Sequence, residues 1–406
     1  MATLFVTGLC FQGNKGGPAI ALSLIDQLRQ QRSDLNFVFA VPGGAAFAHE
    51  KEAAARYGVR VTEAVGLKNI LPPFALAGSR WRRVIAWVHA VRQADAVLDM
   101  TAISYVGPPV GSMKMLLDTR FLCFVLTHLA NRPFLAWTQS YGPFSTKLVA
   151  ALARMDLKRL PLVFCRGTDC QAAVEKLLPG VRAISFPDVA TALPFDHERG
   201  RELVQGVFGH HGPRFVSLSP SAVIYSKKPG EGAANGHVAD MVALCRALRA
   251  RDLDVLLVPH TLRVGYDNPR LCDLAVCRAI RDALKGEMPL QVLEEDLSPG
   301  DLKAAISCAH VHVGARYHSI VAALSAGVPA VSLSWHPKYR DLMREYGQDD
   351  FVFDAIGNTG IEPLLRNLDL LLAEREERAA ALRTAQVRIV ARVAENAQLC
   401  ATLFPR

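Results

Sequence analysis

The sequence reads Ala309-His310-Val311-His312-Val313-Gly314-Ala315-Arg316-Tyr317-His318-Ser319, and a run rich in small residues continues from Ile320 to Ser334. The alternating valines predict a strand that ends at Gly314, and the small residues predict a helix directly after it. Open α/β sheets bind anions at such strand-to-helix turns, because the first helical amides point outward there. We therefore place the chemical centre of the molecule at Arg316 and His318.

Short β-branched runs alternate with longer helical patterns on both sides of this stretch. We expect strands at residues 4–7, 36–41, 59–61, 96–100, 134–139, 162–165, 182–186, 214–219, 255–259, 290–293, 311–314 and 330–333. We expect helices at residues 19–32, 45–57, 80–92, 114–130, 145–157, 169–178, 237–251, 269–284, 299–307, 318–326 and 337–346. This alternation implies right-handed βαβ crossovers and mostly parallel sheets that are covered on both faces.

The chain of 406 residues exceeds the ~250–300 residues at which a single hydrophobic core stops growing. The alternating pattern weakens between Pro187 and Pro213. We therefore predict an α/β protein with an N-terminal Rossmann-like domain at 1–190, a linker at 191–213, a second Rossmann-like domain at 214–350 and a helical segment at 351–406, with one long helix from Ile361 to Leu399. Two doubly wound domains of this kind are expected to face each other across a cleft.

The formal charge of +8 and the sequence pI of about 9.1 favour anionic partners. The arginines are dispersed, and no zinc-finger or RNP signature is present. We therefore rank anionic small substrates and a membrane surface above nucleic acid, which we do not expect as a partner.

The nine cysteines are scattered and form no C-x-x-C pair, which favours a reduced, cytoplasmic compartment. No histidines or cysteines have the spacing of metal ligands, so no metal is expected. No run approaches the ~18 apolar residues that a membrane span requires. We expect a cytoplasmic protein that contacts the inner membrane surface peripherally.

A glycine-rich stretch, Gly8 to Pro18, follows the first predicted strand and precedes a helix. Glycines let backbone amides approach an anion, and Lys15 adds a positive charge beside Asn14. The stretch is neither a Walker A motif nor G-x-G-x-x-G. A turn that merely needs glycine is the alternative reading.

Three further strand ends in the first half carry polar residues: Asp99, Gln139 and Arg166. Asp99 and the residues after it could hydrogen-bond a sugar, although polar residues at strand ends also form turns. Arg166 could bind a carboxylate or phosphate through two parallel hydrogen bonds, or pair with Asp169 at the helix start.

In the second half, Ser219 and Ser221 follow one strand, His260 follows another, and Lys338 comes after a third. A lone histidine is more often structural, but His260 lies at the expected cleft edge. Lys338 either faces a phosphate or is simply solvated.

The order of these motifs resembles the polysaccharide pyruvyltransferase family, from Leu4 to about Gly347. The matching segments are Gly13-Asn14-Lys15-Gly16, Asp99 to Gly107, Gln139 to Pro143, Cys165-Arg166, Ser219-Pro220-Ser221, Val258-Pro259-His260, Gly314 to His318, Ala326-Gly327-Val328-Pro329 and Pro337-Lys338. The sequence departs from the family pattern at Gly17 and at Thr101-Ala102-Ile103. The resemblance implies a GT-B-like fold and transfer of an enolpyruvyl unit from phosphoenolpyruvate to a sugar as a ketal.

By resemblance, Arg166, Arg316 and His318 meet phosphoenolpyruvate, and Tyr317 contributes chiefly its backbone. In this hypothesis His318 protonates the methylene carbon and His260 is the base for a sugar hydroxyl. No cofactor is needed beyond the donor substrate, and the acceptor is a saccharide or a lipid-linked glycan. The residues expected to bind substrate are Arg166, Tyr317, Asn14, Lys15, Asp99, Gln139, Ser219, Ser221 and Lys338.

Two other functions stay open at this point. A nucleotide-sugar-dependent GT-B glycosyltransferase would use the same cations to hold a diphosphate. A non-catalytic glycan-binding member of the family would keep the fold without the reaction. The sequence predicts no oligomeric state.

Overall fold

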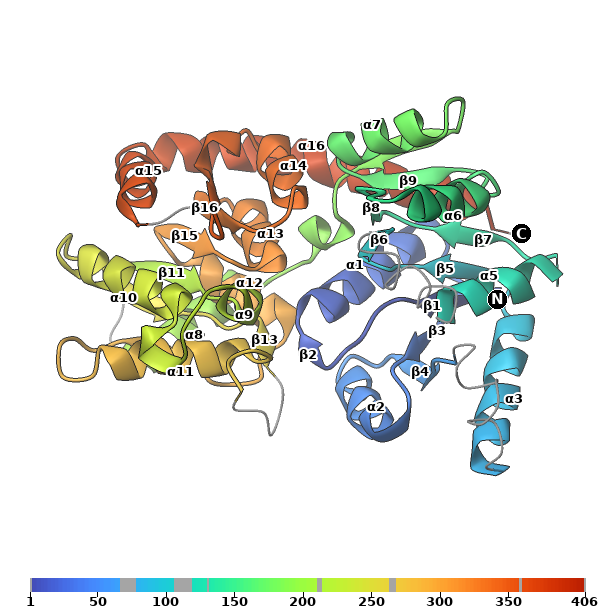
Figure 1. The fold of residues 1–406 in the computed structure, drawn as a ribbon, viewed down its shortest axis with the longest axis horizontal. Coiled ribbons are helices and arrows are strands. Elements are labelled where there is room, and N and C mark those ends of the chain that lie inside the picture. The colour runs from blue at the N-terminus through green and yellow to red at the C-terminus, as the bar shows by residue number, and fades with distance from the viewer. Residues whose placement is uncertain are drawn as a thin grey trace. The chain divides into compact units, whose positions relative to one another are not determined.

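The computed structural model describes residues 2–65, 78–105, 119–129, 131–209, 214–262, 268–357 and 360–404 (Figure 1). The chain forms two compact units. Unit 1 comprises Met1–Gln12, Ile20–Val189 and Ala391–Arg406, and unit 2 comprises Gly13–Ala19 and Ala190–Val390. Asn14 and Lys15 therefore belong to unit 2, although they lie near the start of the chain.

Unit 1 is built on a five-stranded parallel sheet with the order β4-β3-β1-β5-β7. Its strands are β1 (Ala2–Thr7), β3 (Leu35–Val41), β4 (Arg60–Glu63), β5 (Ala96–Asp99) and β7 (Phe134–Ala136). Two parallel pairs accompany it, β9 (Val163–Arg166) with β10 (Ala183–Phe186), and β6 (Ile103–Ser104) with β8 (Ser140–Tyr141). Phe5 of β1 is fully buried against the edge of Trp87, as expected for a central strand covered on both faces.

The helices of unit 1 follow the alternating pattern. They are α2 (Phe47–Ala55), α3 (Gly78–Gln93), α5 (Thr119–Leu129), α6 (Lys147–Leu157) and α7 (Thr168–Leu177). Helix α1 (Gly16–Gln31) begins in the segment assigned to unit 2 and continues in unit 1.

Unit 2 contains a six-stranded parallel sheet with the order β14-β12-β11-β15-β16-β17. Its strands are β11 (Phe215–Ser219), β12 (Asp254–Leu257), β14 (Gln291–Val292), β15 (Val311–Gly314), β16 (Ala330–Ser334) and β17 (Val352–Asp354). A short antiparallel pair joins β2 (Gly13–Asn14) to β13 (Thr261–Leu262). This pair fixes the glycine-rich segment beside the loop that carries His260.

The helices of unit 2 connect its strands. They are α8 (His197–Phe208), α9 (Ala222–Lys227), α10 (Gly236–Arg249), α11 (Asp273–Ala283), α12 (Pro299–Ser307), α13 (Tyr317–Ser325), α14 (Lys338–Glu345), α15 (Glu362–Ala373) and the first part of α16 (Arg375–Thr402). In the described part of the chain, no helix is long and apolar enough to cross a membrane.

The predicted architecture of two doubly wound parallel sheets is confirmed. The predicted long C-terminal helix is confirmed as α16, but its predicted start at Ile361 is wrong, because the chain leaves helical geometry at Glu374 and a separate helix, α15, precedes it. The Glu374 side chain accepts a hydrogen bond from Arg378 one turn into α16. No glycine or proline lies at this break, so the spacing of the leucines predicts one uninterrupted helix.

Smaller differences lie at the weakly patterned segments. Residues 191–213, predicted as a linker, contain α8, whose N-cap Asp196 accepts hydrogen bonds from the amides of Glu198 and Arg199. The predicted strand 134–139 ends at Ala136, and Thr138 adopts a φ of 48°. Residues 114–118 of a predicted helix and residues 210–213 of the predicted linker lie outside the described residues.

Candidate functional site

The turn after β15 has the geometry that its sequence predicts. A Cβ atom on Gly314 would lie 2.7 Å from His312 Nε2 and 2.6 Å from an Ile320 side-chain carbon, so only glycine fits there. Arg316 is the N-cap of α13, and the helix begins at Tyr317. The first amides of α13 are therefore placed at the carboxyl edge of the unit 2 sheet, where an anion is stabilised.

Arg316 is held by a buried carboxylate. Its Nε donates to Asp273 Oδ2 at 2.8 Å and its Nη2 donates to Oδ1 at 2.5 Å. Asp273 is fully buried and also accepts a hydrogen bond from the amide of Ala222 at 2.8 Å. Burial opposes the charge on Arg316, but Asp273 outweighs it and raises the Arg316 pKa. Asp273 takes two of the five guanidinium N–H groups, and the Arg316 side chain keeps 14% of its surface exposed.

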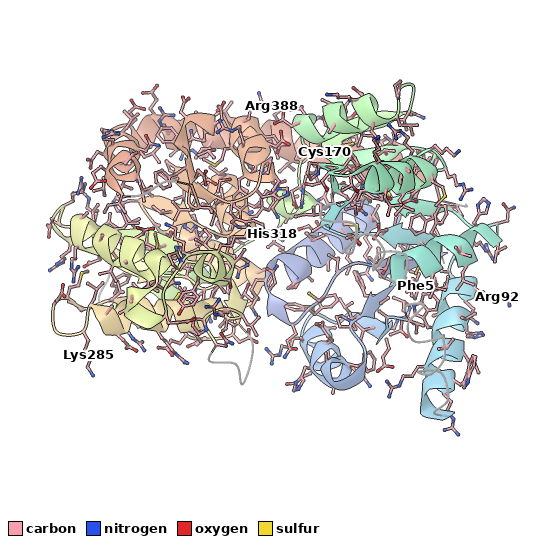
Figure 2. All side chains as sticks on the ribbon, viewed as in Figure 1. Phe5, Arg92, Cys170, Lys285, His318 and Arg388 are labelled. Carbon is pink, nitrogen blue, oxygen red and sulfur yellow. The ribbon has the colours of Figure 1, made fainter. Side chains whose placement is uncertain are left out.

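His318 lies at the start of α13 (Figure 2) and packs against the glycine-rich segment. A Cβ atom on Gly16 would lie 2.1 Å from His318 Nδ1, so a side chain at that position would displace the imidazole. The Asn14 side chain accepts a hydrogen bond from the Gly16 amide at 3.0 Å and fixes the turn. The Tyr317 ring meets the His318 ring edge-on at 5.2 Å. The glycine is thus required by the close approach of a histidine.

Lys15 and His260 are joined through the same segment. The amide of Lys15 donates to the carbonyl of His260 at 2.9 Å, beside the β2–β13 pair. The Lys15 ammonium forms an ion pair with Asp296 at 2.5 Å. Lys15 is buried, whereas Asp296 is partly exposed. This pair orients the lysine at the edge of the sheet.

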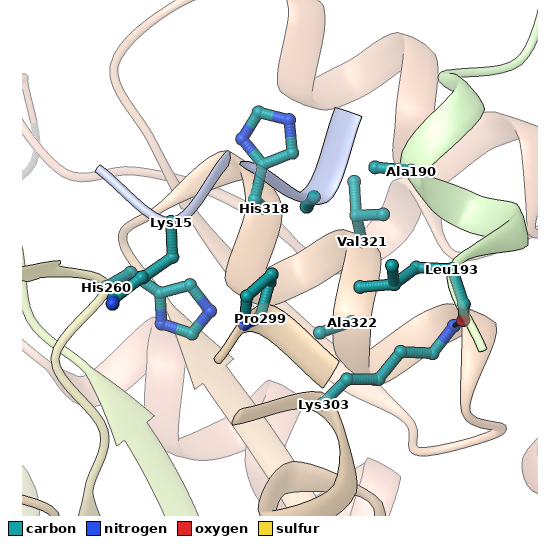
Figure 3. A pocket seen from close by; sticks show the side chains of 10 residues that line it. Lys15, Ala190, Leu193, His260, Pro299, Lys303, His318, Val321 and Ala322 are labelled. Atoms are coloured by element: carbon teal, nitrogen blue, oxygen red, sulfur yellow. Dashed lines mark hydrogen bonds between the residues drawn. The ribbon is translucent and has the colours of Figure 1, made fainter. Parts of the chain in front are cut away.

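A pocket of unit 2 brings Lys15, His260 and His318 together, whereas Arg316 is not among its lining residues (Figure 3). Its empty space, part of which is open solvent, amounts to about 290 Å³. Four nitrogen bases line it, from Lys15, His260, Lys303 and His318, and the remaining lining residues are Ala19, Ala190, Leu193, Pro299, Val321 and Ala322. Basic groups above an apolar floor are suited to a small anion with a hydrocarbon part.

Burial sets the protonation of two of these groups. It lowers the pKa of His260 to about 4 and the pKa of Lys303 to about 7. His260 is therefore neutral at neutral pH. The Lys303 ammonium donates to the carbonyl of Leu193 at 2.7 Å and lies 5.1 Å from the Phe195 ring centroid.

The two predicted serines lie close to buried histidines. Ser219 Oγ donates to the carbonyl of Val258 at 2.8 Å and lies 3.5 Å from His260 Nδ1. Ser221 caps α9, and its amide donates to His237 Nε2 at 3.1 Å. Burial lowers the His237 pKa to about 3. Ser219 thus supports the orientation of His260, and Ser221 shapes the loop after β11.

His312 is fully buried in the core of unit 2. Its two ring nitrogens lie 2.9 Å from Ser217 Oγ and 3.0 Å from Ser319 Oγ. Burial lowers its pKa to about 3. The neutral ring fixes Ser319, whose hydroxyl donates to the carbonyl of Arg316 at 2.8 Å. His312 therefore supports the turn that carries Arg316.

The predicted residues of unit 1 form a separate network at the ends of β5, β7 and β9. Gln139 Nε2 donates to the Asp99 carboxylate at 2.7 Å, and Gln139 Oε1 accepts from Ser104 Oγ at 2.7 Å. Arg166 donates to Asp188 at 2.7 Å, to Ser140 Oγ at 3.1 Å and to the carbonyl of Ala102 at 2.6 Å. Asp99, Gln139 and Arg166 are all buried.

Sequence reasoning missed the acidic partners of the cations and the fourth base of the pocket. Asp188, Asp273 and Asp296 lie 22, 43 and 281 positions from Arg166, Arg316 and Lys15, and a single sequence gives no signal for such distant pairs. Lys303 follows the predicted helix start at Ser298-Pro299, where a lysine is usually exposed at the surface.

Within the described residues, no group of His, Cys, Asp or Glu side chains could hold a metal ion.

Comparison with known families gives one match. The model of the family described as polysaccharide pyruvyl transferase matches residues 14–337. This range contains every predicted catalytic or substrate-binding residue except Lys338. Among curated proteins, no relative matches the sequence.

Solved structures share the fold at low sequence identity. UDP-GlcNAc 2-epimerase from Neisseria meningitidis, bound to UDP-GlcNAc, has a TM-score of 0.59 and 11% identity, with 99% of each chain covered. Anabaena HepE in complex with UDP has a TM-score of 0.56 and 15% identity, with 99% of each chain covered. UGT73P12 from Glycyrrhiza uralensis, complexed with glycyrrhetinic acid 3-O-monoglucuronide, has a TM-score of 0.56 and 7% identity, covering 99% of this chain and 96% of that chain. The predicted GT-B-like fold is confirmed by these neighbours.

Proposed function

Because the chain belongs to the polysaccharide pyruvyl transferase family, we propose that it moves a pyruvyl group from phosphoenolpyruvate to a sugar and forms a cyclic ketal. The observation that carries this proposal is the unit 2 pocket, where His318, Lys15 and His260 converge inside the segment that the family model matches. Its nitrogen-bearing side chains have the chemistry to meet the anionic groups of phosphoenolpyruvate, and its apolar side chains have the chemistry to meet the methylene group.

The reaction adds a proton to the methylene carbon of phosphoenolpyruvate, which becomes the methyl group of the ketal. One sugar hydroxyl attacks the cationic C2, the C2–O bond to phosphate breaks, and a second hydroxyl closes the ring. Of the two protons that the hydroxyls lose, one balances the proton gained by the methyl group and the other leaves with inorganic phosphate. No electrons change hands, and no cofactor is required.

In this reaction Arg316 binds the carboxylate or phosphate of the donor. Asp273 fixes the guanidinium plane through Nε and Nη2, so the remaining N–H groups are oriented before the substrate arrives. The amides at the start of α13, including that of Tyr317, add hydrogen bonds to the same anion. The transition state is stabilised by donors that need no rearrangement.

His318 is the general acid for the methylene carbon, and His260 is the base for a sugar hydroxyl. The low pKa of His260, about 4 and caused by burial, keeps its ring neutral before the reaction. His318 is located by Gly16 on one side and Tyr317 on the other. The two histidines therefore have opposite proton-transfer roles in one pocket.

Unit 1 supplies the acceptor side in this proposal, through Asp99 and Gln139 at the sheet edge. Arg166, predicted to meet the donor, makes three hydrogen bonds within its own unit. We propose that its main contribution is to hold the loop containing Ala102 in the conformation that binds the sugar. The acceptor is a saccharide or a lipid-linked glycan, and the protein works in the cytoplasm.

The test is to incubate the purified chain with labelled phosphoenolpyruvate and a panel of glycan fragments in EDTA. Phosphate release that depends on the glycan, with a ketal detected by mass, supports the proposal. Release of a nucleoside diphosphate from a nucleotide sugar would instead identify a glycosyltransferase. Glycan binding without turnover would identify a binding protein, and a requirement for a divalent ion would contradict the metal-free mechanism.

A further inference from the structure

Two free cysteines of unit 1, Cys165 and Cys170, are in direct contact. Cys165 lies in β9, and Cys170 lies in the first turn of α7 (Figure 2). Gly167, the N-cap of α7, has a φ of 89°, a conformation that favours glycine and lets the helix begin directly after the strand. The Cys165 thiol donates a hydrogen bond to the sulfur of Cys170. The turn therefore brings the two sulfur atoms together.

The sulfur of Cys170 has further polar partners. The amide of Tyr141 donates to Cys170 Sγ at 3.1 Å, and the Cys170 thiol donates to the carbonyl of Gln139 at 3.4 Å. The hydrogen bond from Cys165, the Tyr141 amide and the charge of Arg166 lower the pKa of Cys170, although burial opposes them. The hydrogen bond to Cys170 and burial raise the pKa of Cys165. One sulfur is thus favoured as the thiolate, which is the nucleophile, and the other stays a thiol.

A second cysteine pair, in unit 2, has the same spacing and is also buried, but its surroundings differ. Cys272 is the N-cap of α11, and Cys277 lies within that helix. The Cys272 thiol donates to the carbonyl of Thr261 at 3.5 Å. Burial, the charge of Asp273 and the neighbouring cysteines raise the pKa of Cys277 well above its ordinary value. Cys277 is therefore kept as an unreactive thiol, whereas Cys170 has the partners that a reactive sulfur requires.

The contacts of Cys165 and Cys170 lead to the polar network of unit 1. Cys165 forms a parallel β-bridge with Gln139, and the Cys170 sulfur contacts the backbone of both Gln139 and Tyr141. The amide of Arg166 donates to the same Gln139 carbonyl at 2.8 Å. A change at the two sulfurs therefore alters the hydrogen bonds around Gln139, which belongs to the proposed acceptor side.

We propose that Cys165 and Cys170 are a reversible redox pair, which a peroxide closes to an intrachain disulfide. The Cys170 thiolate attacks one oxygen of hydrogen peroxide, the O–O bond breaks, and a sulfenic acid forms as hydroxide leaves and takes a proton from solvent. The Cys165 sulfur then attacks the sulfenic sulfur, the S–O bond breaks, and the thiol proton leaves with the hydroxyl group as water. The sulfurs lose two electrons in total, and the peroxide becomes two waters. A thiol reductant reverses the closure by exchange.

Closure of the disulfide removes the thiol hydrogen that Cys170 donates to the Gln139 carbonyl. It also replaces a sulfur that accepts the Tyr141 amide by a weaker, uncharged acceptor. Both changes act on the segment from Gln139 to Tyr141. We expect the oxidised protein to bind the sugar acceptor less well, and this consequence, unlike the disulfide itself, rests on the proposed pyruvyl transfer.

The chemical test treats the purified full chain with hydrogen peroxide, unfolds it, alkylates the remaining thiols with iodoacetamide and maps the peptides by mass spectrometry. We expect a linkage between Cys165 and Cys170 that dithiothreitol removes, while Cys272 and Cys277 are recovered alkylated. In Cys165→Ala, Cys170 should instead be trapped by dimedone as a sulfenic acid.

Two results of the peptide map would overturn the redox pair. One is that Cys165 and Cys170 stay reduced under conditions that oxidise the partly exposed Cys10 and Cys308. The other is that the linkage of Cys272 to Cys277 forms to the same extent, because the surroundings of Cys170 would then make no difference. Both results come from the wild-type protein and do not depend on the folding of a variant.

Kinetics test the consequence for the acceptor. With a competent glycan, peroxide should raise the acceptor KM of the wild type by about tenfold, the equivalent of one lost hydrogen bond, and dithiothreitol should restore it. The KM for phosphoenolpyruvate should stay within about twofold, and Cys170→Ala should show no difference between treated and untreated samples. A mapped disulfide with an unchanged acceptor KM would refute the link to Gln139. If no glycan is pyruvylated, the mapped disulfide still supports the redox pair, and only the proposed reaction fails.

Discussion

Arg166 in unit 1 and Arg316 in unit 2 occupy similar positions after a parallel strand, yet their surroundings differ. Arg166 donates from Nε, Nη1 and Nη2 to three internal acceptors, and 4% of its side chain is exposed. Arg316 donates from Nε and Nη2 to one aspartate, and 14% of its side chain is exposed. Arg166 thus holds neighbouring segments of unit 1 together through its hydrogen bonds. Arg316 instead has its guanidinium oriented by Asp273 at the edge of the unit 2 sheet.

This comparison also separates the two polar clusters. In unit 1 the hydrogen-bond partners of Arg166 and Gln139 are other residues of the protein. Removing one of these partners leaves a buried polar group unsatisfied and therefore lowers the stability of the fold. In unit 2 the nitrogen-bearing side chains line a pocket that is partly open to solvent. We therefore expect changes in unit 1 to act mainly on folding and changes in unit 2 to act mainly on turnover.

The largest effect is expected for His318→Gln. If His318 donates the proton to the methylene carbon, kcat should fall by about 10²–10⁴, while the KM for phosphoenolpyruvate changes little. Steady-state kinetics and the melting temperature of the variant are the measurements. A folded variant with near-normal turnover would remove His318 from the mechanism.

Asp188→Asn should destabilise unit 1 strongly, because it leaves the buried Arg166 charge without its carboxylate. Breaking a buried ion pair in this way typically costs about 3–5 kcal/mol. Urea unfolding measures the change, and Asp369→Asn, which breaks the more exposed pair with Arg251, should cost no more than about 1 kcal/mol. Equal losses in the free energy of unfolding for Asp188→Asn and Asp369→Asn would show that the Arg166–Asp188 pair does not stabilise unit 1.

Arg316→Lys keeps the charge but loses the two-point contact with Asp273. We expect the KM for phosphoenolpyruvate to rise by about tenfold, because lysine cannot present the guanidinium geometry. The thermal stability should fall much less than in Asp188→Asn. If stability and activity fall in proportion, Arg316 only orders the turn after Gly314.

Lys303 should give the stability of unit 2 a distinct pH dependence. Its pKa is lowered by burial from 10.5 to about 7, so between these values the unfolded chain binds a proton that the folded chain does not. Stability should therefore rise as the pH increases from about 7 toward 10.5, and below about pH 7 the full cost of burying the charge is present. Urea midpoints of wild type and Lys303→Met across this range test it, and an identical pH slope in both would contradict the assignment.

The smallest effect concerns membranes, since each lysine or arginine near an anionic surface contributes only about 1 kcal/mol. The net charge of +8 should give co-sedimentation with anionic liposomes at low salt. The attachment should weaken as salt screens charges beyond ~8 Å. Attachment that is absent at low salt, or is unchanged by high salt, would refute the prediction.

Local patterns predicted most of the fold, because each strand and its turn residues lie within a few positions. Val311, Val313 and Gly314 suffice to place β15 and the turn after it. Helix α8 was not predicted from the sequence. Its few buried apolar residues, such as Leu203 and Val204, are surrounded by glycines and charged residues, so no helical pattern of apolar residues is evident. The break between helices α15 and α16 at Glu374 was not predicted, because no glycine or proline lies there.

The candidate site was predicted only in part, for a different physical reason. Lys15, His260 and His318 could be placed at sheet edges one by one, and the fold brings them to one pocket. Charge balance depends on contacts between distant positions, so the pairing of Arg316 with Asp273 could not be predicted. The burial of Lys303 could not be predicted either, because it depends on contacts with a distant segment: the Lys303 ammonium donates to the carbonyls of Thr191 and Leu193.

The central claim is that the unit 2 pocket protonates the methylene carbon of phosphoenolpyruvate during ketal formation. The most direct measurement is to run the reaction in D₂O with a competent glycan and to analyse the ketal methyl group by mass spectrometry and NMR. The account predicts one solvent deuterium in each product methyl group, phosphate released in equal amount, and loss of both signals in His318→Gln. A methyl group without solvent deuterium, or full deuterium incorporation and turnover in His318→Gln, would contradict it.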